Sequence, residues 1–239
     1  LPPTKTNQLK RMKTEIAFIL DRSGSMSTMA HAAISGFNEF LLGQQNTLDD
    51  QQRSMEANLT LVLFDTEYLM IHDRAPLKNA LPLTSETYQP RGSTALLDAI
   101  GRTIDELGAK LAATPEADRP VKVIVAILTD GEENASRQFT MNEVNQRITH
   151  QTNQYAWEFL FLGANQDAIA TAAHLGIAAH QAASFCANVD DLDSANKAFS
   201  KKISASRKFA AAMKLNEEEQ VCLNESVAET LVKERNLKQ

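Results

Sequence analysis

The segment VKVIVAILTD, residues 121–130, decides the fold class of this chain. It is an almost continuous run of apolar, mostly β-branched residues that ends in Thr129 and Asp130. Such a run is typical of a strand that is buried on both faces of a parallel sheet. TEIAFIL at 14–20 and WEFLFLGA at 157–164 have the same character. The sequence therefore predicts a sheet whose central strands are parallel.

Segments with helical periodicity separate these strands. In residues 94–113, for example, Leu97, Ile100, Ile104 and Leu107 form one apolar stripe. The other expected elements are helices at 29–45, 140–150, 166–177 and 193–214, strands at 58–65 and 67–72 joined as a hairpin, and a weak last strand at 178–185. This alternation predicts an α/β, doubly wound, Rossmann-like fold. Its central sheet is mostly parallel, with one antiparallel edge strand and helices on both faces.

The two ends of the chain differ from this α/β region. Residues 1–11, LPPTKTNQLKR, are polar and without period, so we expect a disordered leader, with Met12 as a possible natural start. We expect the α/β domain to cover residues 12–214 and a helical tail to cover residues 215–239.

The tail carries its own helix signals. Asn216 and Glu219 have the spacing of a capping box, and Leu223, Val227 and Leu231 fall at i, i+4 and i+8 on one helix face. Two interpretations of this helix remain open at this stage: it docks on the domain, or it binds a partner.

Composition narrows the class of protein. With 239 residues, 43% of them hydrophobic, the chain is long enough for one α/β domain with a full core. A net charge of −6 argues against a general nucleic-acid binder, since phosphate neutralisation needs clustered Lys and Arg. No apolar run approaches the length of a membrane span, which is roughly 18 residues. Cys186 and Cys222 fit no disulfide or metal pattern, so we expect reduced thiols and a cytoplasmic protein.

Oxygen-bearing side chains follow the predicted strands at three places. Asp21, Ser23 and Ser25 follow the first strand, Thr94 lies in a glycine-containing loop before a helix, and Asp130 ends the strand at 121–130. In a parallel sheet, ligands bind outside the carboxyl ends of the strands, so these side chains are expected to converge. Carboxylates and hydroxyls are hard ligands that suit Mg²⁺, Mn²⁺ or Ca²⁺ better than Zn²⁺ or Cu²⁺. We expect Mg²⁺, with Ca²⁺ or Mn²⁺ as alternatives.

This pattern resembles the metal-ion-dependent adhesion site of von Willebrand factor type A (vWA) domains. The resemblance covers residues 12–212 in order and spacing, and YQPRGSTALLDAIG (88–101) and ILTDGEENAS (127–136) resemble the bacterial and phage branch. It implies that Ser23 and Ser25 ligate the metal directly and that Thr94 does so directly or through water. Asp21 and Asp130 would act mainly through water or by supporting the ligands. The implied function is not enzymatic: a protein partner supplies an Asp or Glu carboxylate to the ion.

The electrostatics of such a site fit this role. Neutral hydroxyls leave the 2+ charge incompletely neutralised, so an anionic ligand from a partner is attracted. Two alternatives stay open: a Mg²⁺-dependent hydrolase or phosphotransferase that uses the same ion, and a structural subunit of a cytosolic ATPase-type assembly. No P-loop, G-x-G-x-x-G or G-x-S-x-G motif supports an enzyme.

Three other polar features receive structural interpretations. Glu132 and Glu133 are expected to be exposed residues near a helix start, and His31 a solvated helix residue. The run DDLD is expected to cap the closing helix.

Overall fold

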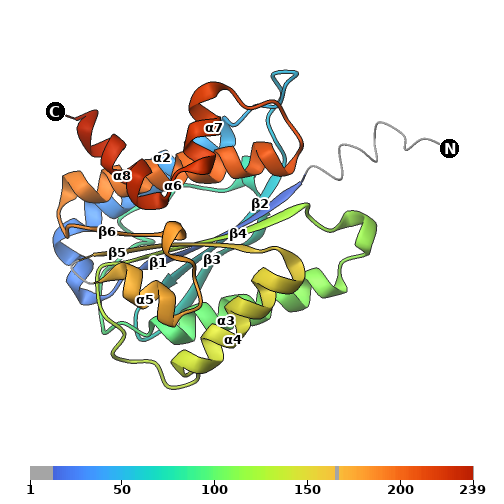
Figure 1. Ribbon diagram of the computed structural model, residues 1–239. Coiled ribbons are helices and arrows are strands. Elements are labelled where there is room, and N and C mark those ends of the chain that lie inside the picture. Colours follow the sequence, from blue (N-terminus) through green and yellow to red (C-terminus); the bar gives the residue numbers. More distant parts are fainter. Residues whose placement is uncertain (1–12, 165–166, 239) are drawn as a thin grey trace.

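A computed structural model describes residues 13–164 and 167–238 and shows one six-stranded sheet (Figure 1). The strands are β1 (Thr14–Asp21), β2 (Ala57–Phe64), β3 (Tyr68–Pro76), β4 (Lys122–Thr129), β5 (Glu158–Ala164) and β6 (Ala182–Phe185). Their order is β3-β2-β1-β4-β5-β6, and all neighbours are parallel except β2 and β3. The predicted fold class is therefore confirmed, including the antiparallel edge.

Helices cover both faces of the sheet. They are α2 (Ala30–Gln45), α3 (Leu96–Ala113), α4 (Met141–Tyr155), α5 (Ala168–His174), α6 (Val189–Ala210), α7 (Glu217–Asn224) and α8 (Val227–Asn236). In Figure 1, α3, α4 and α5 lie below the sheet, while α2, α6, α7 and α8 lie above it. Short 3₁₀ helices occur at Gly24–Met29, Leu77–Asn79, Glu116–Asp118 and Ala179–Gln181.

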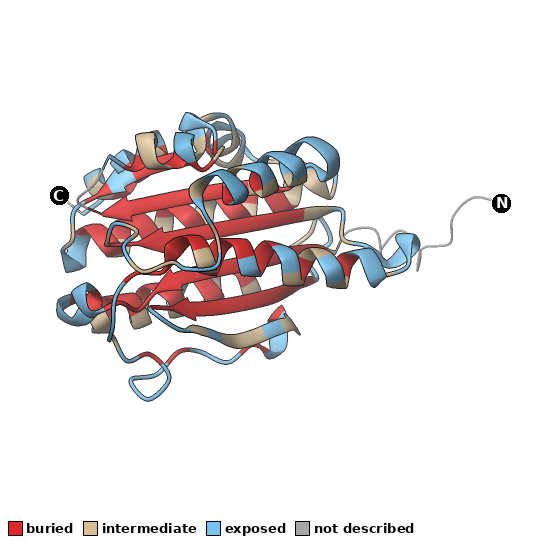
Figure 2. Cartoon of the chain, turned by 90° about the horizontal axis from the view of Figure 1, so that it is seen from below, coloured by how far each residue is buried: buried red, intermediate tan, exposed pale blue. Residues whose placement is uncertain are grey.

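Strand β1 shows why its sequence is continuously apolar. All of its residues are buried, and alternate side chains enter two different cores. Phe18 faces the core under α2 and α6, where its ring centroid lies 4.9 Å from Phe40 and 6.1 Å from Phe199. Ile19 faces the opposite core, under α3 and α4. Figure 2 shows the strands as a buried layer between helices whose outer faces are exposed.

Several predicted boundaries differ from the structure. The second hairpin strand continues to Pro76, through register shifts opposite β2 and a positive φ of 47° at Arg74. The weak strand predicted at 178–185 is shorter because a 3₁₀ turn occupies its first half. The predicted leader and Met12 lie outside the described residues, as do two residues near the start of α5.

The closing helix begins earlier than predicted. Asn188 caps α6, since its side chain accepts from the Asp191 amide at 2.9 Å. The run DDLD is therefore part of the first helical turns, and the prediction that it forms the cap is wrong. Its carboxylates still benefit from the helix N-terminus, where negative charge is favoured.

The tail forms two helices, so the prediction of one continuous helical face is wrong. The chain turns at Glu225 and Ser226, and α7 and α8 each begin with a capping box. Val227 and Leu231 on α8 are fully buried in the core under α6, while Leu223 on α7 is only half-buried.

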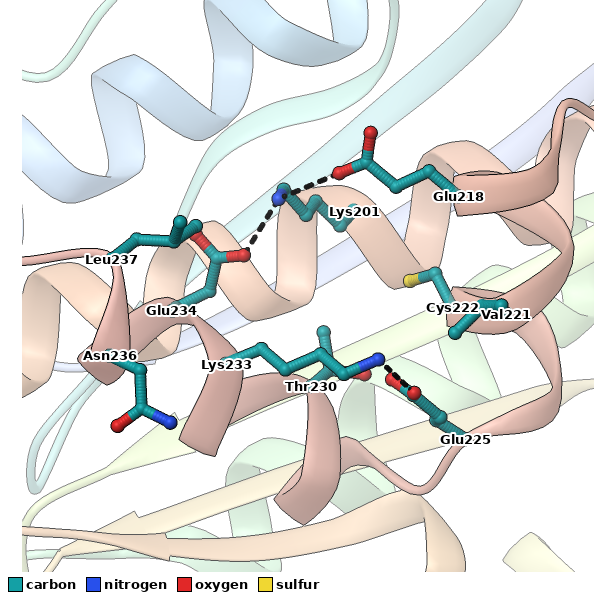
Figure 3. A pocket seen from close by; sticks show the side chains of 10 residues that line it. All are labelled: Lys201, Glu218, Val221, Cys222, Glu225, Thr230, Lys233, Glu234, Asn236 and Leu237. Carbon is teal, nitrogen blue, oxygen red and sulfur yellow. Dashed lines mark hydrogen bonds and ion pairs between the residues drawn. The ribbon is translucent and has the colours of Figure 1, made fainter.

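Polar contacts hold the tail on α6. Lys201 forms ion pairs with Glu218 at 3.3 Å and with Glu234 at 2.8 Å (Figure 3). Lys202 is buried beneath them and donates to the Cys222 carbonyl at 2.7 Å. The Lys202 ammonium group therefore donates to carbonyls in the last turn of α7. These carbonyls have no amide partner within the helix because α7 ends there.

Candidate metal centre

The first site loop begins where β1 ends. Asp21 is fully buried, and its Oδ1 accepts from the Ser23 amide at 2.7 Å. Its Oδ2 accepts from the hydroxyl of Thr129, the last residue of β4, at 2.5 Å. The Tyr88 hydroxyl donates to the Asp21 carbonyl at 2.6 Å. The Asp21 carboxylate is therefore fixed between two neighbouring strand ends.

Side-chain oxygens continue from this loop to the next strand. Ser23 Oγ and Ser25 Oγ lie 3.0 Å apart, and Ser25 Oγ donates to Asp130 Oδ1 at 2.7 Å. Ser23 is buried and Ser25 is exposed, so the group extends from the sheet end to the surface. Segments separated by 105 residues thus meet at the carboxyl ends of β1 and β4.

Thr94 comes from the third segment. A Cβ placed on Gly131 would lie 3.0 Å from Thr94 Oγ1 and 3.7 Å from Ser25 Oγ, so both hydroxyls face the same small space. The Thr94 amide donates to Asn134 Oδ1 at 2.9 Å, and its carbonyl accepts from the Asn134 amide at 3.1 Å. Sequence reasoning missed Asn134, because its role depends on how the loop after β4 folds back.

Glu133 also has a role that the sequence did not predict. It is half-buried, and its carboxylate accepts from the Leu97 amide at 2.9 Å and from the Ser136 hydroxyl at 2.7 Å. The expectation of an exposed residue is therefore wrong for Glu133, although Glu132 is exposed. A carboxylate at the first turn of α3 satisfies a free amide and interacts favourably with the helix dipole.

Asp65 aligns the first two site loops. It is fully buried, and its Oδ2 lies 3.0 Å from Arg22 Nε and 3.1 Å from Arg91 Nε. The Arg91 amide also donates to the Arg22 carbonyl at 2.9 Å, and the Asp65 carbonyl accepts from the Ala95 amide at 3.0 Å. The sequence analysis included Asp65 only as the last residue of the strand predicted at 58–65, since local patterns do not show which charges it will meet.

Burial shifts the acidity of both site carboxyl groups. Burial raises the pKa of Asp21 to about 6, although hydrogen bonds from Thr129 and Ser23 oppose the shift. Burial likewise raises the pKa of Asp130, and the hydrogen bond from Ser25 opposes it. A nearby cation would stabilise the charged form of both groups.

The side chains that meet at the strand ends include few charged groups for a metal site. Among the described residues, no three His, Cys, Asp or Glu side chains cluster as metal ligands would. The group at the strand ends instead combines two carboxylates with three hydroxyls. His31 is exposed, as expected.

Comparisons with known proteins agree with this architecture. The pilus adhesin SpaC from Lactobacillus rhamnosus GG superposes with a TM-score of 0.57 at 15% identity, over 81% of this chain and 30% of that chain. The von Willebrand factor type A protein from Catenulispora acidiphila has a TM-score of 0.51 at 15% identity, over 81% of this chain and 43% of that chain. The fold is that of a vWA domain. The vWF domain of the type V pili tip protein Mfa5 from Porphyromonas gingivalis matches over 86% of this chain and 97% of its own, with a TM-score of 0.56 at 10% identity.

These vWA likenesses concern the fold alone, because all three identities are low. The chain spans less than half the length of SpaC and of the Catenulispora protein. No family model and no curated protein matches the sequence. Within residues 13–164 and 167–238, no helix is long and apolar enough to span a bilayer.

Proposed function

We propose that this vWA domain is a protein-binding module that works through a bound divalent cation, with Mg²⁺ as the preferred ion. Ser23 and Ser25 would ligate the ion directly, and Thr94 would do so directly or through water. Asp21 and Asp130 would hold the hydroxyls and the bound waters in place. A partner protein would supply an Asp or Glu carboxylate to the ion.

The contact series Ser23–Ser25–Asp130 is the observation that carries this proposal. Octahedral Mg²⁺ has metal–oxygen distances of about 2.0–2.1 Å, which places adjacent ligands about 2.9 Å apart. The Ser23 Oγ–Ser25 Oγ separation of 3.0 Å is close to that value, so these two hydroxyls are already spaced as neighbouring ligands. Asp130 holds Ser25 through the 2.7 Å hydrogen bond, and Thr94 faces the same space.

The charge of the donor set supports binding as the function. The proposed direct ligands are neutral hydroxyls and the two carboxylates would act mainly through water, so the charge of the ion would be incompletely neutralised by the atoms that contact it. An incoming carboxylate would then gain strong electrostatic attraction. SpaC is a pilus adhesin and Mfa5 is a pili tip protein, which is consistent with a binding role for this fold. No observation at the site favours the hydrolase alternative, and we propose no catalytic residue.

Titration calorimetry with Mg²⁺ tests the metal half of the proposal. We expect saturable binding to the full chain and at least about a tenfold loss of affinity in Ser25→Ala. Thr28→Ala is a matched control, because Thr28 is exposed in the same 3₁₀ helix and should leave binding unchanged. Absence of Mg²⁺ binding by the folded wild type would refute the assignment.

Acetate is the simplest probe for the carboxylate half. With Mn²⁺ in place of Mg²⁺, the protein should broaden the acetate proton resonance more than the same Mn²⁺ bound to chelator does. The extra broadening should disappear in Ser25→Ala. Equal broadening with the wild type and with Ser25→Ala would contradict ligation of a partner carboxylate. It would not contradict metal binding, which calorimetry tests separately.

A further inference from the structure

A cavity of about 300 Å³ lies at the end of the sheet opposite the metal centre. It is bordered by the starts of β4 and β5 and by the C-terminal parts of α3 and α4. The metal centre lies at the carboxyl ends of these parallel strands, so the two sites are separated by the length of the sheet. Nothing in the proposed function uses this second location.

The walls of the cavity are aromatic and aliphatic. Trp157 is 5% exposed and stacks on Phe159 with ring centroids 6.2 Å apart, so its ring is fixed. Tyr155 contacts His150 edge-on at 5.7 Å, yet it remains 61% exposed. Leu111 is buried in the wall. Apolar and aromatic surface beside polar side chains is typical of sites for small molecules.

The charge-bearing side chains that line the cavity are all basic. Of the described residues that line it, Arg119, Lys122 and His150 can carry positive charge, and none is a carboxylate. Arg119 donates to backbone carbonyls, from Nε to Thr114 and from Nη2 to Ala112, each at 3.0 Å. Lys122 is 3.1 Å from Glu158, which does not line the cavity. Arg119 therefore retains its charge for an anionic group.

The cavity between α6, α7 and α8 provides a contrast. There Lys201 and Lys233 are paired with glutamates that line the same space (Figure 3). The two lysines of that cavity thus face three glutamates, whereas the cavity beside Trp157 is lined, among the described residues, by basic side chains and by no carboxylate.

We propose that the cavity beside Trp157 binds a small aromatic molecule that carries one carboxylate. The aromatic ring would contact Trp157 and Tyr155, and the carboxylate would accept from Arg119. A planar guanidinium binds a carboxylate well because it offers several donors in one plane. A body of about ten non-hydrogen atoms suits a site at the lower end of the usual size range.

Phenylacetate is the probe for this proposal, and phenethylamine is its control with the opposite charge. Trp157 is the only tryptophan in the chain, so its fluorescence reports on the cavity wall directly. We expect a saturable change in emission with phenylacetate and binding at least about tenfold weaker with phenethylamine. Equal affinity for both, or no saturation with either, would overturn the proposal.

Two arginine variants test whether phenylacetate binds at Arg119 or non-specifically to the protein. Arg119→Gln should weaken phenylacetate about tenfold while leaving phenethylamine unchanged, because a charge-assisted hydrogen bond is lost. Arg53→Gln is the matched control, since Arg53 is an exposed loop arginine that is paired with Asp49. Thermal unfolding checks that both variants are folded. Unchanged phenylacetate affinity in folded Arg119→Gln would overturn the proposal.

Discussion

Ser25 Oγ donates a 2.7 Å hydrogen bond to Asp130 Oδ1 and thereby connects the loop after β1 to the loop after β4. The two residues contribute little to the core, since Ser25 is exposed and Asp130 lies at the end of the sheet. A contact of this kind is therefore better explained by a ligand that both residues face than by stability. This reasoning leads to predictions that separate metal affinity from folding.

Ser25→Ala should separate Mg²⁺ affinity from folding stability most clearly. We expect Mg²⁺ affinity to fall at least about tenfold, because one hydroxyl ligand is removed. The free energy of unfolding measured without metal should stay within about 0.5 kcal/mol of the wild type, as is usual for exposed positions. Urea denaturation with and without Mg²⁺ measures both. A large loss of stability in the metal-free variant would show that Ser25 has a structural role instead.

Gly131→Ala should also reduce Mg²⁺ affinity, because Gly131 borders the space that the Thr94 and Ser25 hydroxyls face. Its new Cβ would lie 3.0 Å from Thr94 Oγ1, so that hydroxyl would have to shift, while the 3.7 Å contact with Ser25 Oγ is an ordinary one. Gly108→Ala is the control, because its Cβ would make an ordinary 3.5 Å contact with Gln151 Nε2. Calorimetry with Mg²⁺ should show weaker binding only for Gly131→Ala. Equal affinity in both variants would contradict the placement of Thr94 at the ion.

Asp65→Asn should disturb both folding and metal binding. Loss of the buried negative charge leaves Arg22 and Arg91 with only the exposed Glu67 as a shared partner, and we expect about 2–4 kcal/mol of destabilisation. Mg²⁺ affinity should fall as well, because the two loops that Asp65 aligns carry Ser23 and Thr94. Asp73→Asn, which breaks an exposed ion pair with Lys110, should change neither quantity measurably. Urea denaturation and calorimetry provide the two readouts.

The fold and the centre of the site were predictable because their signals are local. β1, β4 and β5 are buried on both faces, so each appears as a continuous apolar run. Asp21, Ser23 and Ser25 are close in sequence, and Thr94 and Asp130 also follow expected element boundaries. Convergence then follows from the parallel arrangement of the strands.

The missed features depend on contacts that no local pattern encodes. Glu133 supports α3 only because the loop after β4 folds over Leu97 and Ser136. The break between α7 and α8 was missed for another reason. Leu223 and Val227 are four residues apart, so the apolar spacing of one helix continues across the turn that separates the two helices. Ser226 and Glu229 nevertheless have capping-box spacing, so the start of α8 was visible in the sequence.

The ion pair between Asp191 and Arg235 should make the docking of α8 depend on pH. Burial would raise the pKa of Asp191, but hydrogen bonds from Arg235 and the Cys186 amide outweigh it and lower the pKa. A lowered pKa means that the stabilisation is present above the unfolded value of about 3.9 and is lost as the pH falls through the folded value. Asp191→Asn should cost about 1 kcal/mol at pH 7. Denaturation at pH 7 and pH 3 should show that this difference shrinks in acid, whereas a constant difference would exclude the charge as its cause.

The two leucines of α8 offer a direct test of whether this helix is part of the folded unit. Leu231 is 1% exposed within the core under α6, and Leu237 is 75% exposed at the end of the helix. Leu231→Ala should therefore cost about 2–4 kcal/mol through lost burial and a residual cavity. Leu237→Ala should change the free energy of unfolding by less than about 0.5 kcal/mol. Urea denaturation of both variants, followed at the same probe, decides the matter. Equal and small effects of the two substitutions would mean that α8 leaves the domain in solution and is available to a partner. A large effect of Leu231→Ala alone means that α8 stabilises the sheet face that supports α2 and α6.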